Sequence, residues 1–203
     1  MPYSRLAQQA SATDRHGVRI TWKDAASSAA IVAAMATALA LMGHPAICKC
    51  GYVKAWHGVP LSSENSQHIS DWYTFSHVIH GFAFYGLAWL VARRQPLGRR
   101  LAAAVVLECA WEVFENTDFV INRYREVTIS LDYYGDSVLN SVADVSAMVL
   151  GFFAAARLPV WGTVLLVIAF EAFVGYAIRD NLLLNIIMLI YPLDVIRRWQ
   201  ANP

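Results

Sequence analysis

The sequence predicts an all-α fold, a bundle of about six transmembrane helices with five strong spans and one short one. The 203-residue chain is 57% hydrophobic and only 15% charged, against roughly 25% charged residues in typical soluble domains. Its mean hydropathy is +0.40. The apolar residues also fall in runs close to the ~20 residues that a spanning helix needs. The expected partner is therefore the lipid bilayer, and the net charge of +1 indicates no nucleic acid.

Three regions are expected along the chain. Residues 1–24 form a cytoplasmic leader with four basic residues, 25–197 form the transmembrane bundle, and 198–203 form a cytoplasmic tail. A lipoprotein signal has a small residue before its cysteine, whereas bulky Ile47 precedes Cys48. No convincing small-residue cleavage site stands out there either, so the first span is expected to be an uncleaved anchor.

Six segments are the candidate spans. The last is short and is interrupted by Asn185 and Pro192, so it is either a tilted half-span or a re-entrant segment. The segments are 25–42, 73–92, 99–116, 138–156, 159–177 and 182–196.

The distribution of arginine and lysine predicts the orientation of the bundle. Residues 93–100 are the most basic stretch, and with alternating spans Arg157 and residues 197–198 lie on the same side. Because basic residues are retained in the cytoplasm, both termini are expected there. Loops 44–72 and 117–137 then face outward, towards the periplasm if the protein lies in a bacterial inner membrane.

Ionisable residues inside the spans indicate a site. The third span places Glu108, Glu112 and Glu115 at i, i+4 and i+7, on one stripe of a helix. Carboxylates at the centre of a membrane helix cost roughly 2.5–3.5 kcal/mol each, so they mark functional positions or paired groups. In the second span, His77 and His80 are three residues apart and share a face.

The fourth span repeats this pattern with Asp136, Asn140 and Asp144 at i, i+4 and i+8. The alternation of the spans places all these side chains near the outer side. We therefore expect them to line a shared polar pocket that opens to the periplasm. The residues expected to carry chemistry are His77, His80, Glu112, Glu115, Asn140 and Asp144.

Several roles fit such a pocket. Imidazole and carboxylate groups bind zinc, manganese or iron, so His77, His80 and Glu112 are candidate ligands of a divalent metal ion, although no cofactor is specified by the sequence. The same groups suit acid–base catalysis, a proton or substrate path, or a structural network of ion pairs.

The outer loops add further candidates. Cys48 and Cys50, flanked by histidines, could ligate zinc or copper, or be oxidised in a compartment that permits disulfides. A bond between positions i and i+2 is strained, so an intermolecular disulfide or a metal-bound state is the alternative to one within the loop. Arg123 and Arg125 suit the phosphate of a lipid headgroup, or pair with neighbouring carboxylates. Asp71 and Asp136 complete the residues expected to bind substrate.

Four strings carry a resemblance to known proteins: SENSQHISDWYTFSHVIHGFAFYG, ECAWEVFENTDFVINRYRE, DYYGDSVLNSVADVSAMVLGF and RDNLLLNIIMLIYPLDVIRRWQ. They resemble a family of uncharacterised multi-pass inner-membrane proteins of alphaproteobacteria, over most of the chain beyond the leader. This resemblance supports the membrane prediction and implies no reaction.

A partial resemblance, over the middle three spans, is to the VanZ-like membrane proteins of cell-envelope chemistry. Asp71 and His77, then Glu112, then Asp136 and Asn140 match their pattern. Two departures, at positions 115 and 144, replace a Gln and a Gly with Glu115 and Asp144. The pocket is therefore more acidic than that pattern, which puts a shared substrate in doubt.

Two functions follow from these observations. The first is an envelope enzyme that acts on a phosphorylated lipid or lipid-linked sugar, with Glu112 or a histidine as base. The second is a non-enzymatic membrane factor, such as a transporter subunit or an assembly or resistance factor, whose polar network is structural or carries protons.

Overall fold

A computed structural model describes residues 20–128 and 132–201. Most of the expected leader, residues 1–19, and the last two residues of the expected tail lie outside this range. The described residues form helices and no strands, which confirms the predicted all-α class. The helices are α2 (Trp22–Leu41), α3 (Thr74–Ala92), α4 (Leu97–Glu115), α5 (Asp118–Val127), α6 (Val138–Arg157), α7 (Val160–Ile178), α8 (Leu182–Ile190) and α9 (Asp194–Gln200).

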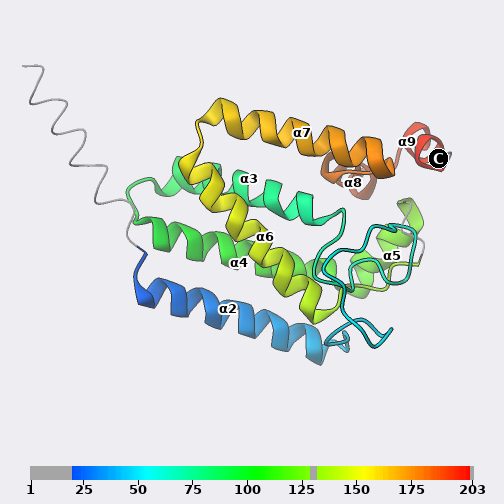
Figure 1. The fold of residues 1–203 in the computed structure, drawn as a ribbon, viewed down its shortest axis with the longest axis horizontal. Helices are drawn as coiled ribbons and strands as arrows, with labels where there is room; N and C mark the ends of the chain where they lie inside the picture. Colours follow the sequence, from blue (N-terminus) through cyan, green and yellow to red (C-terminus); the bar gives the residue numbers. More distant parts are fainter. Residues whose placement is uncertain (1–19, 129–131, 202–203) are drawn as a thin grey trace, which may run out of the picture.

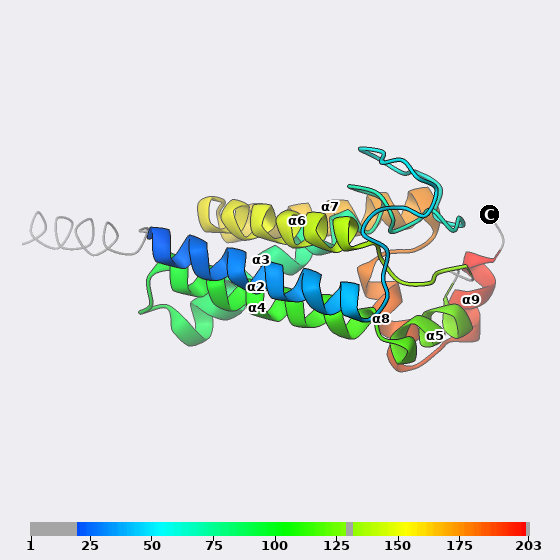
Figure 2. The same ribbon diagram turned by 90° about the horizontal axis from the view of Figure 1, so that it is seen from below.

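The five long helices, α2, α3, α4, α6 and α7, run along the long axis of the molecule (Figure 1). The short helices α5, α8 and α9 gather at one end, together with the loop between α2 and α3 (Figure 2). We call this end the capped end. The connections from α3 to α4 and from α6 to α7 lie at the opposite end, which we call the basic end.

Four of these helices are long and apolar enough to cross a membrane: α2, α3, α6 and α7. The fifth, α4, has a comparable length of 19 residues, but it carries two arginines and three glutamates. The five strong predicted spans therefore correspond to five helices, of which α4 differs in composition because it carries part of the polar cluster.

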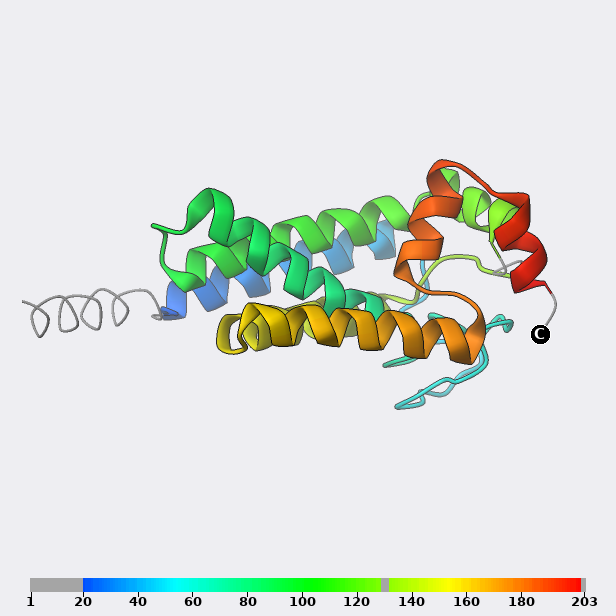
Figure 3. The same cartoon turned by 90° about the horizontal axis from the view of Figure 1, so that it is seen from above.

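The sixth predicted segment does not cross back through the bundle. It forms α8, of nine residues, and α9, of seven, separated around Pro192. Both lie at the capped end (Figure 3), where Arg197 Nη2 donates to the carbonyl of Glu126, 2.9 Å away. The start of α2 and the end of α9 therefore lie at opposite ends of the bundle. Six complete crossings would bring these two points to the same end of the bundle, and the membrane surface that each terminus faces stays a prediction.

Loop 117–137, which is expected to face outward, contains a helix that the hydropathy pattern did not predict. Helix α5 is amphipathic and buries Val120, Ile121 and Val127. An apolar run marks a membrane span, whereas a short helix with one apolar face lies at a boundary and gives no such run. Helix α5 covers the capped end, next to α8.

The closest helix contact brings α3 against α6, and two glycines permit it. A Cβ on Gly81 would lie 2.1 Å from the carbonyl oxygen of Met148, and one on Gly151 would lie 2.2 Å from that of Val78. Small residues of this kind let the backbones of two membrane helices come into direct contact. Because His77 and Asp144 lie one to two turns towards the capped end of this contact, it sets their separation.

Candidate functional site

The site is centred on His77, in the second turn of α3. Its Nδ1 lies 2.6 Å from Glu108 Oε1 and 3.5 Å from Glu112 Oε1, both on α4. Its Nε2 lies 3.7 Å from Asp144 Oδ2 on α6. One buried imidazole thus joins three helices, as the stripes on the three predicted spans indicate.

Glu108 is hydrogen-bonded to both His77 and His80. His80 Nδ1 lies 3.1 Å from Glu108 Oε2, so both oxygens of this fully buried carboxylate contact an imidazole. A hydrogen bond to a carboxylate places the ring proton on Nδ1 and leaves Nε2 with its lone pair. Metal-binding histidines are commonly oriented in this way.

Glu112 differs from the other buried carboxylates. The side chain is fully buried, and neither of its oxygens has a hydrogen-bond partner. A buried charge is normally paired or bound to a metal ion, because removing it from water unpaired is costly. Glu112 is therefore a buried carboxylate whose one charged contact is His77, at 3.5 Å, and whose oxygens accept no hydrogen bond from the described residues.

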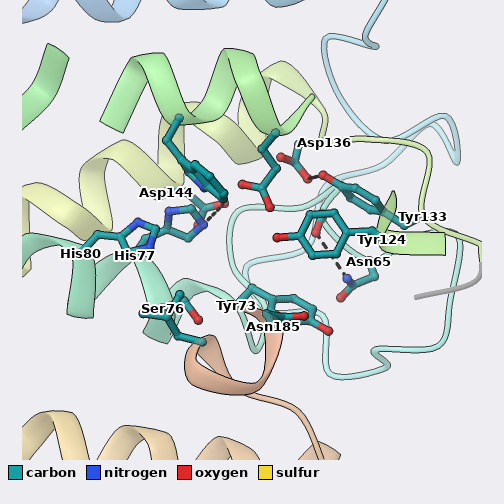
Figure 4. Close-up of a pocket in the computed structure, with 14 residues that line it drawn as sticks. Asn65, Tyr73, Ser76, His77, His80, Tyr124, Tyr133, Asp136, Asp144 and Asn185 are labelled. Atoms are coloured by element: carbon teal, nitrogen blue, oxygen red, sulfur yellow. Dashed lines mark hydrogen bonds and ion pairs between the residues drawn. The ribbon is translucent and has the colours of Figure 1, made fainter. Parts of the chain in front are cut away.

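Beside this cluster lies a pocket of about 60 Å³, enough for several water molecules. His77, His80 and Asp144 form one side of it (Figure 4). Glu108 and Glu112 lie behind this side. The other lining residues are Asn65, Ser66, Tyr73, Ser76, Trp111, Glu115, Tyr124, Tyr133, Asp136, Leu182 and Asn185.

Glu115 and Asp136 lie on the far side of the pocket, against two tyrosines. Asp136 accepts hydrogen bonds from Asn116 Nδ2 at 2.8 Å and from Tyr133 OH at 3.0 Å. Burial raises the pKa of Asp136 to about 6, against the effect of these donors. Burial likewise raises the pKa of Tyr124, whose hydroxyl is hydrogen-bonded to Glu115. These tyrosines therefore stay protonated and serve as donors.

Two predicted residues lie outside the pocket and hold backbone segments near it. Asn140 Nδ2 donates to the carbonyl of His68, 2.9 Å away. Asp71 accepts from the backbone N–H groups of Ser66 at 3.0 Å and Tyr73 at 2.8 Å, and burial raises its pKa. Asn140 thus ties the loop before α3 to α6, whereas Asp71 joins two residues within that loop. Neither Asn140 nor Asp71 lines the pocket.

The arginines of the outer loop are directed at carbonyl groups. Arg123 Nε donates to the carbonyl of Leu189, 3.0 Å away, and Arg125 Nε donates to that of Tyr133. Neither lines the pocket, and the described lining residues include no lysine or arginine. Phosphate binding by Arg123 and Arg125 stays a prediction, without support from their positions.

The cysteines of loop 44–72 are oxidised, as one of the predicted states has it, but in an intramolecular disulfide between Cys48 and Cys50, which the i, i+2 spacing was expected to disfavour. In this form neither sulfur is a thiolate, the state that binds metal, so their ligation stays a prediction for the reduced chain. Glu64 lies beside them and accepts from Lys54 Nζ at 2.6 Å. Hydrogen bonds from Lys54, His68 and Tyr52 lower the pKa of Glu64 to about 2.

Two overlapping groups can supply metal ligands within the bundle. One is His77, His80 and Glu108, and the other is His77, Glu112 and Asp144. In each, one ligand atom per residue lies within 4.8 Å of the others. The predicted ligands His77, His80 and Glu112 lie in the same cluster, whereas Asn140, which was expected to line the pocket, is not part of it.

Three residues of the cluster and the pocket were not among the site residues predicted from the sequence. Glu108 lies on the predicted glutamate stripe, so its position was visible, but its contact with both histidines was not. Tyr124 and Tyr133 follow no spacing rule, because the loop and α5 fold over the pocket. Only the tertiary structure brings them to it.

Comparison with known proteins gives consistent results. A family model described as a protein of unknown function (DUF2585) matches residues 39–202. A UPF0314 protein of Paracoccus denitrificans is 62% identical over 160 residues, which cover 79% of this chain and 83% of that protein. One from Sinorhizobium fredii is 55% identical over 95% of this chain and 98% of its own length. One from Novosphingobium aromaticivorans is 53% identical over 93% and 99%. No solved structure matches the chain.

Proposed function

This chain belongs to the DUF2585 family of proteins of unknown function, and we propose that it is a membrane protein that binds a divalent metal ion in its polar cluster and acts with it on a substrate in the adjoining pocket. The expected membership of an uncharacterised alphaproteobacterial family is confirmed. The likeness to VanZ-like proteins stays a prediction.

The observation that carries the proposal is the buried carboxylate of Glu112, which has an ion-pair contact with His77 but no hydrogen-bond donor. Its two oxygens are buried without a donor, and Asp144 and His77 offer ligand atoms within 4.8 Å. A metal ion there would be bound by two carboxylates and an imidazole, which suits zinc, manganese or iron. Glu108 would orient His77 from behind, as second carboxylates do for metal-binding histidines.

The balance of charges in the cluster also supports a bound divalent cation. The cluster and the pocket lining contain Glu108, Glu112, Glu115, Asp136 and Asp144, whereas their cationic candidates are two histidines. In low-dielectric surroundings such an excess of carboxylates requires bound protons or a bound cation. A divalent ion balances two of these charges at once.

A bound metal ion would also determine the chemistry. It lowers the pKa of a bound water molecule towards neutrality and polarises a carbonyl or phosphoryl oxygen. His80, at the side of the pocket, is positioned to exchange protons with a substrate there. Metal-assisted hydrolysis or group transfer is the reaction class that this arrangement supports.

The proposed substrate is a phosphorylated lipid or a lipid-linked envelope precursor. With no lysine or arginine among the described lining residues, the metal ion would supply the positive charge that a phosphate group needs. Leu182 and Trp111 give part of the lining an apolar character, which suits a substrate that arrives from the bilayer. The distribution of basic residues supports an opening on the periplasmic side of an inner membrane.

The second candidate is a non-enzymatic factor with a structural or proton-carrying network. The hydrogen bonds of Glu108 to both histidines favour it, because they satisfy part of the cluster without a metal ion. The paired substitution His77→Leu with Glu108→Leu separates the two functions. A structural network tolerates such a balanced apolar replacement, whereas a metal site does not.

Metal content tests the proposal. We would purify the wild type, Glu112→Gln and, as a matched control, the exposed Glu126→Gln in detergent without chelators. Each would be loaded with Zn²⁺, Mn²⁺ or Fe²⁺ and measured by elemental analysis. The wild type and Glu126→Gln should retain a near-stoichiometric metal ion. Glu112→Gln should bind it at least ~10-fold more weakly, since even the outer partners of metal ligands cost that much.

Helix content measured by circular dichroism would show that each variant is folded. A folded wild type that retains none of the three metals would overturn the metal site and favour the non-enzymatic factor. Equal retention by Glu112→Gln and the wild type would remove Glu112 from the site. A metal lost only with Cys48→Ser/Cys50→Ser would move it to the outer loop.

A further inference from the structure

A second hollow extends from beside the polar cluster, where Phe84 contacts His80, to the basic end of the bundle. It has a volume of about 270 Å³ and lies between α3 and α4. Its apolar walls include Phe84, Leu87 and Val91 from α3. Ala103 and Ala104 of α4 face them, and their small side chains leave the space open.

The hollow is accessible from the lipid side of the bundle. Leu87 is 47% exposed, Val91 76% and Leu107 43%, and all three line it. An apolar space of about 150 Å³ already admits a benzene-sized ligand. In a membrane, the apolar groups available to fill such a groove are lipid acyl chains.

One end of the groove is cationic. Gln95, Arg99 and Arg100 line it there, beside the exposed Arg93 and Arg94 in the connection between the helices. Arg99 Nη1 donates to Gln95 Oε1 at 3.1 Å, which directs both polar groups to the same place. This end is the one that the basic residues predict to face the cytoplasm.

Arg100 is the residue that indicates a ligand. It is only 9% exposed, and its Nε has no hydrogen-bond partner. None of the ion pairs among the described residues includes it. Its guanidinium lies 5.3 Å from the ring centre of Tyr85, a contact that leaves its N–H donors available. A buried guanidinium of this kind lacks an anion.

We propose that this groove is a binding site for an anionic phospholipid. One acyl chain lies between α3 and α4, and the headgroup phosphate contacts Arg100 and Arg99. The length of the apolar walls and the two arginines at one end match the two parts of such a lipid. Basic pockets between membrane helices on the cytoplasmic side bind anionic headgroups in this way. The site is independent of the metal cluster and of the function proposed above.

Native mass spectrometry of the full-length protein in detergent tests the proposal. Phosphatidylglycerol and phosphatidylcholine with the same acyl chains are the two probes. The wild type should bind one phosphatidylglycerol in preference to phosphatidylcholine. Arg100→Gln and Arg99→Gln should each weaken phosphatidylglycerol binding about five-fold and leave phosphatidylcholine unchanged, since one arginine near a headgroup contributes that much.

Two further variants define the position of the lipid. Ala103→Phe fills the groove from an exposed position, so it should displace either lipid. Arg157→Gln removes an exposed arginine at the same end but outside the groove, and should bind as the wild type does. Because Arg99 is exposed, its variant tests the headgroup contact even where Arg100→Gln fails to fold. Equal binding of the two lipids by the wild type, or unchanged binding by Arg99→Gln and Ala103→Phe, would overturn the site.

Discussion

At the scale of the residue, the buried carboxylates are of two kinds. Asp71, Asp136 and Asp180 each accept hydrogen bonds from backbone or side-chain donors, so they fix the loops of the capped end. Glu112 has no donor. The sequence shows all of them as acidic residues near membrane boundaries, and spacing alone does not distinguish the two kinds. The distinction depends on donors that come from other segments, such as Asn116 and Tyr73.

Asp180 allows a test of this residue-level account through pH. It accepts from Tyr73 OH at 2.9 Å and Gln200 Nε2 at 3.0 Å, and burial raises its pKa from 3.8 to about 6. The protonated carboxyl therefore stabilises the folded chain fully below about pH 4, and this contribution is lost as the pH rises through 6. We expect the free energy of unfolding of the wild type to fall, relative to that of Asp180→Asn, by up to about 3 kcal/mol between pH 4 and 7.

Denaturant unfolding in detergent at fixed pH values would measure this difference. Asp132→Asn, at an exposed position, is the matched control and should give a difference from the wild type that does not vary over this range. A pH-independent difference for Asp180→Asn would contradict the assignment of a raised pKa to this residue.

At the scale of the element, the contact between α3 and α6 determines whether the cluster forms. The predicted spans 73–92 and 138–156 agree with these helices to within one residue at each end, because long apolar runs are unambiguous. Their approach at Gly81 and Gly151 was not predicted. Glycine is common in the apolar runs of membrane helices. Which of these glycines contacts the backbone of another helix is decided only when the helices pack.

Gly81→Ala tests the role of this contact. The added methyl group would lie 2.1 Å from the carbonyl oxygen of Met148 and 2.6 Å from the amide nitrogen of Phe152, so the two helices must separate. We expect a loss of about 1–3 kcal/mol in the free energy of unfolding and weaker metal binding, because His77 moves away from Asp144.

The control is Gly86→Ala on the same helix, where a Cβ meets no atom within 4 Å. The free energy of unfolding of this variant and its metal binding should match those of the wild type. Equal behaviour of the two variants in unfolding and in elemental analysis would show that the glycine contact does not hold the site in place.

At the scale of the whole molecule, the described residues form five long helices, so α2 begins at the basic end and α9 ends at the capped end (Figure 1). Helices α5, α8 and α9 and the loop before α3 cover the pocket end. The basic connection lies at the other end, beside the second hollow. The two sites proposed here therefore lie towards opposite membrane surfaces.

Reporter fusions test this topology. With the basic end in the cytoplasm, alkaline phosphatase fused after the last residue should be active and green fluorescent protein fused there should be dark. Fusions within the connection between α3 and α4 should show the reverse. An active phosphatase in that connection, or a fluorescent fusion at the C-terminus, would contradict the arrangement of five crossings.

The sequence by itself determined the helical membrane class, the ends of the long helices and the stripes of His77, Glu112 and Asp144. These features depend on local periodicity and on the cost of ionisable groups in a bilayer. The tertiary structure decided the rest. It turned residues 182–200 back onto the capped end, directed Arg123 and Arg125 to carbonyl groups, and left the oxygens of Glu112 and the Nε of Arg100 without a hydrogen-bond partner. Such outcomes depend on which distant donors and acceptors packing brings together, and the spacing of residues along one helix carries no information about them.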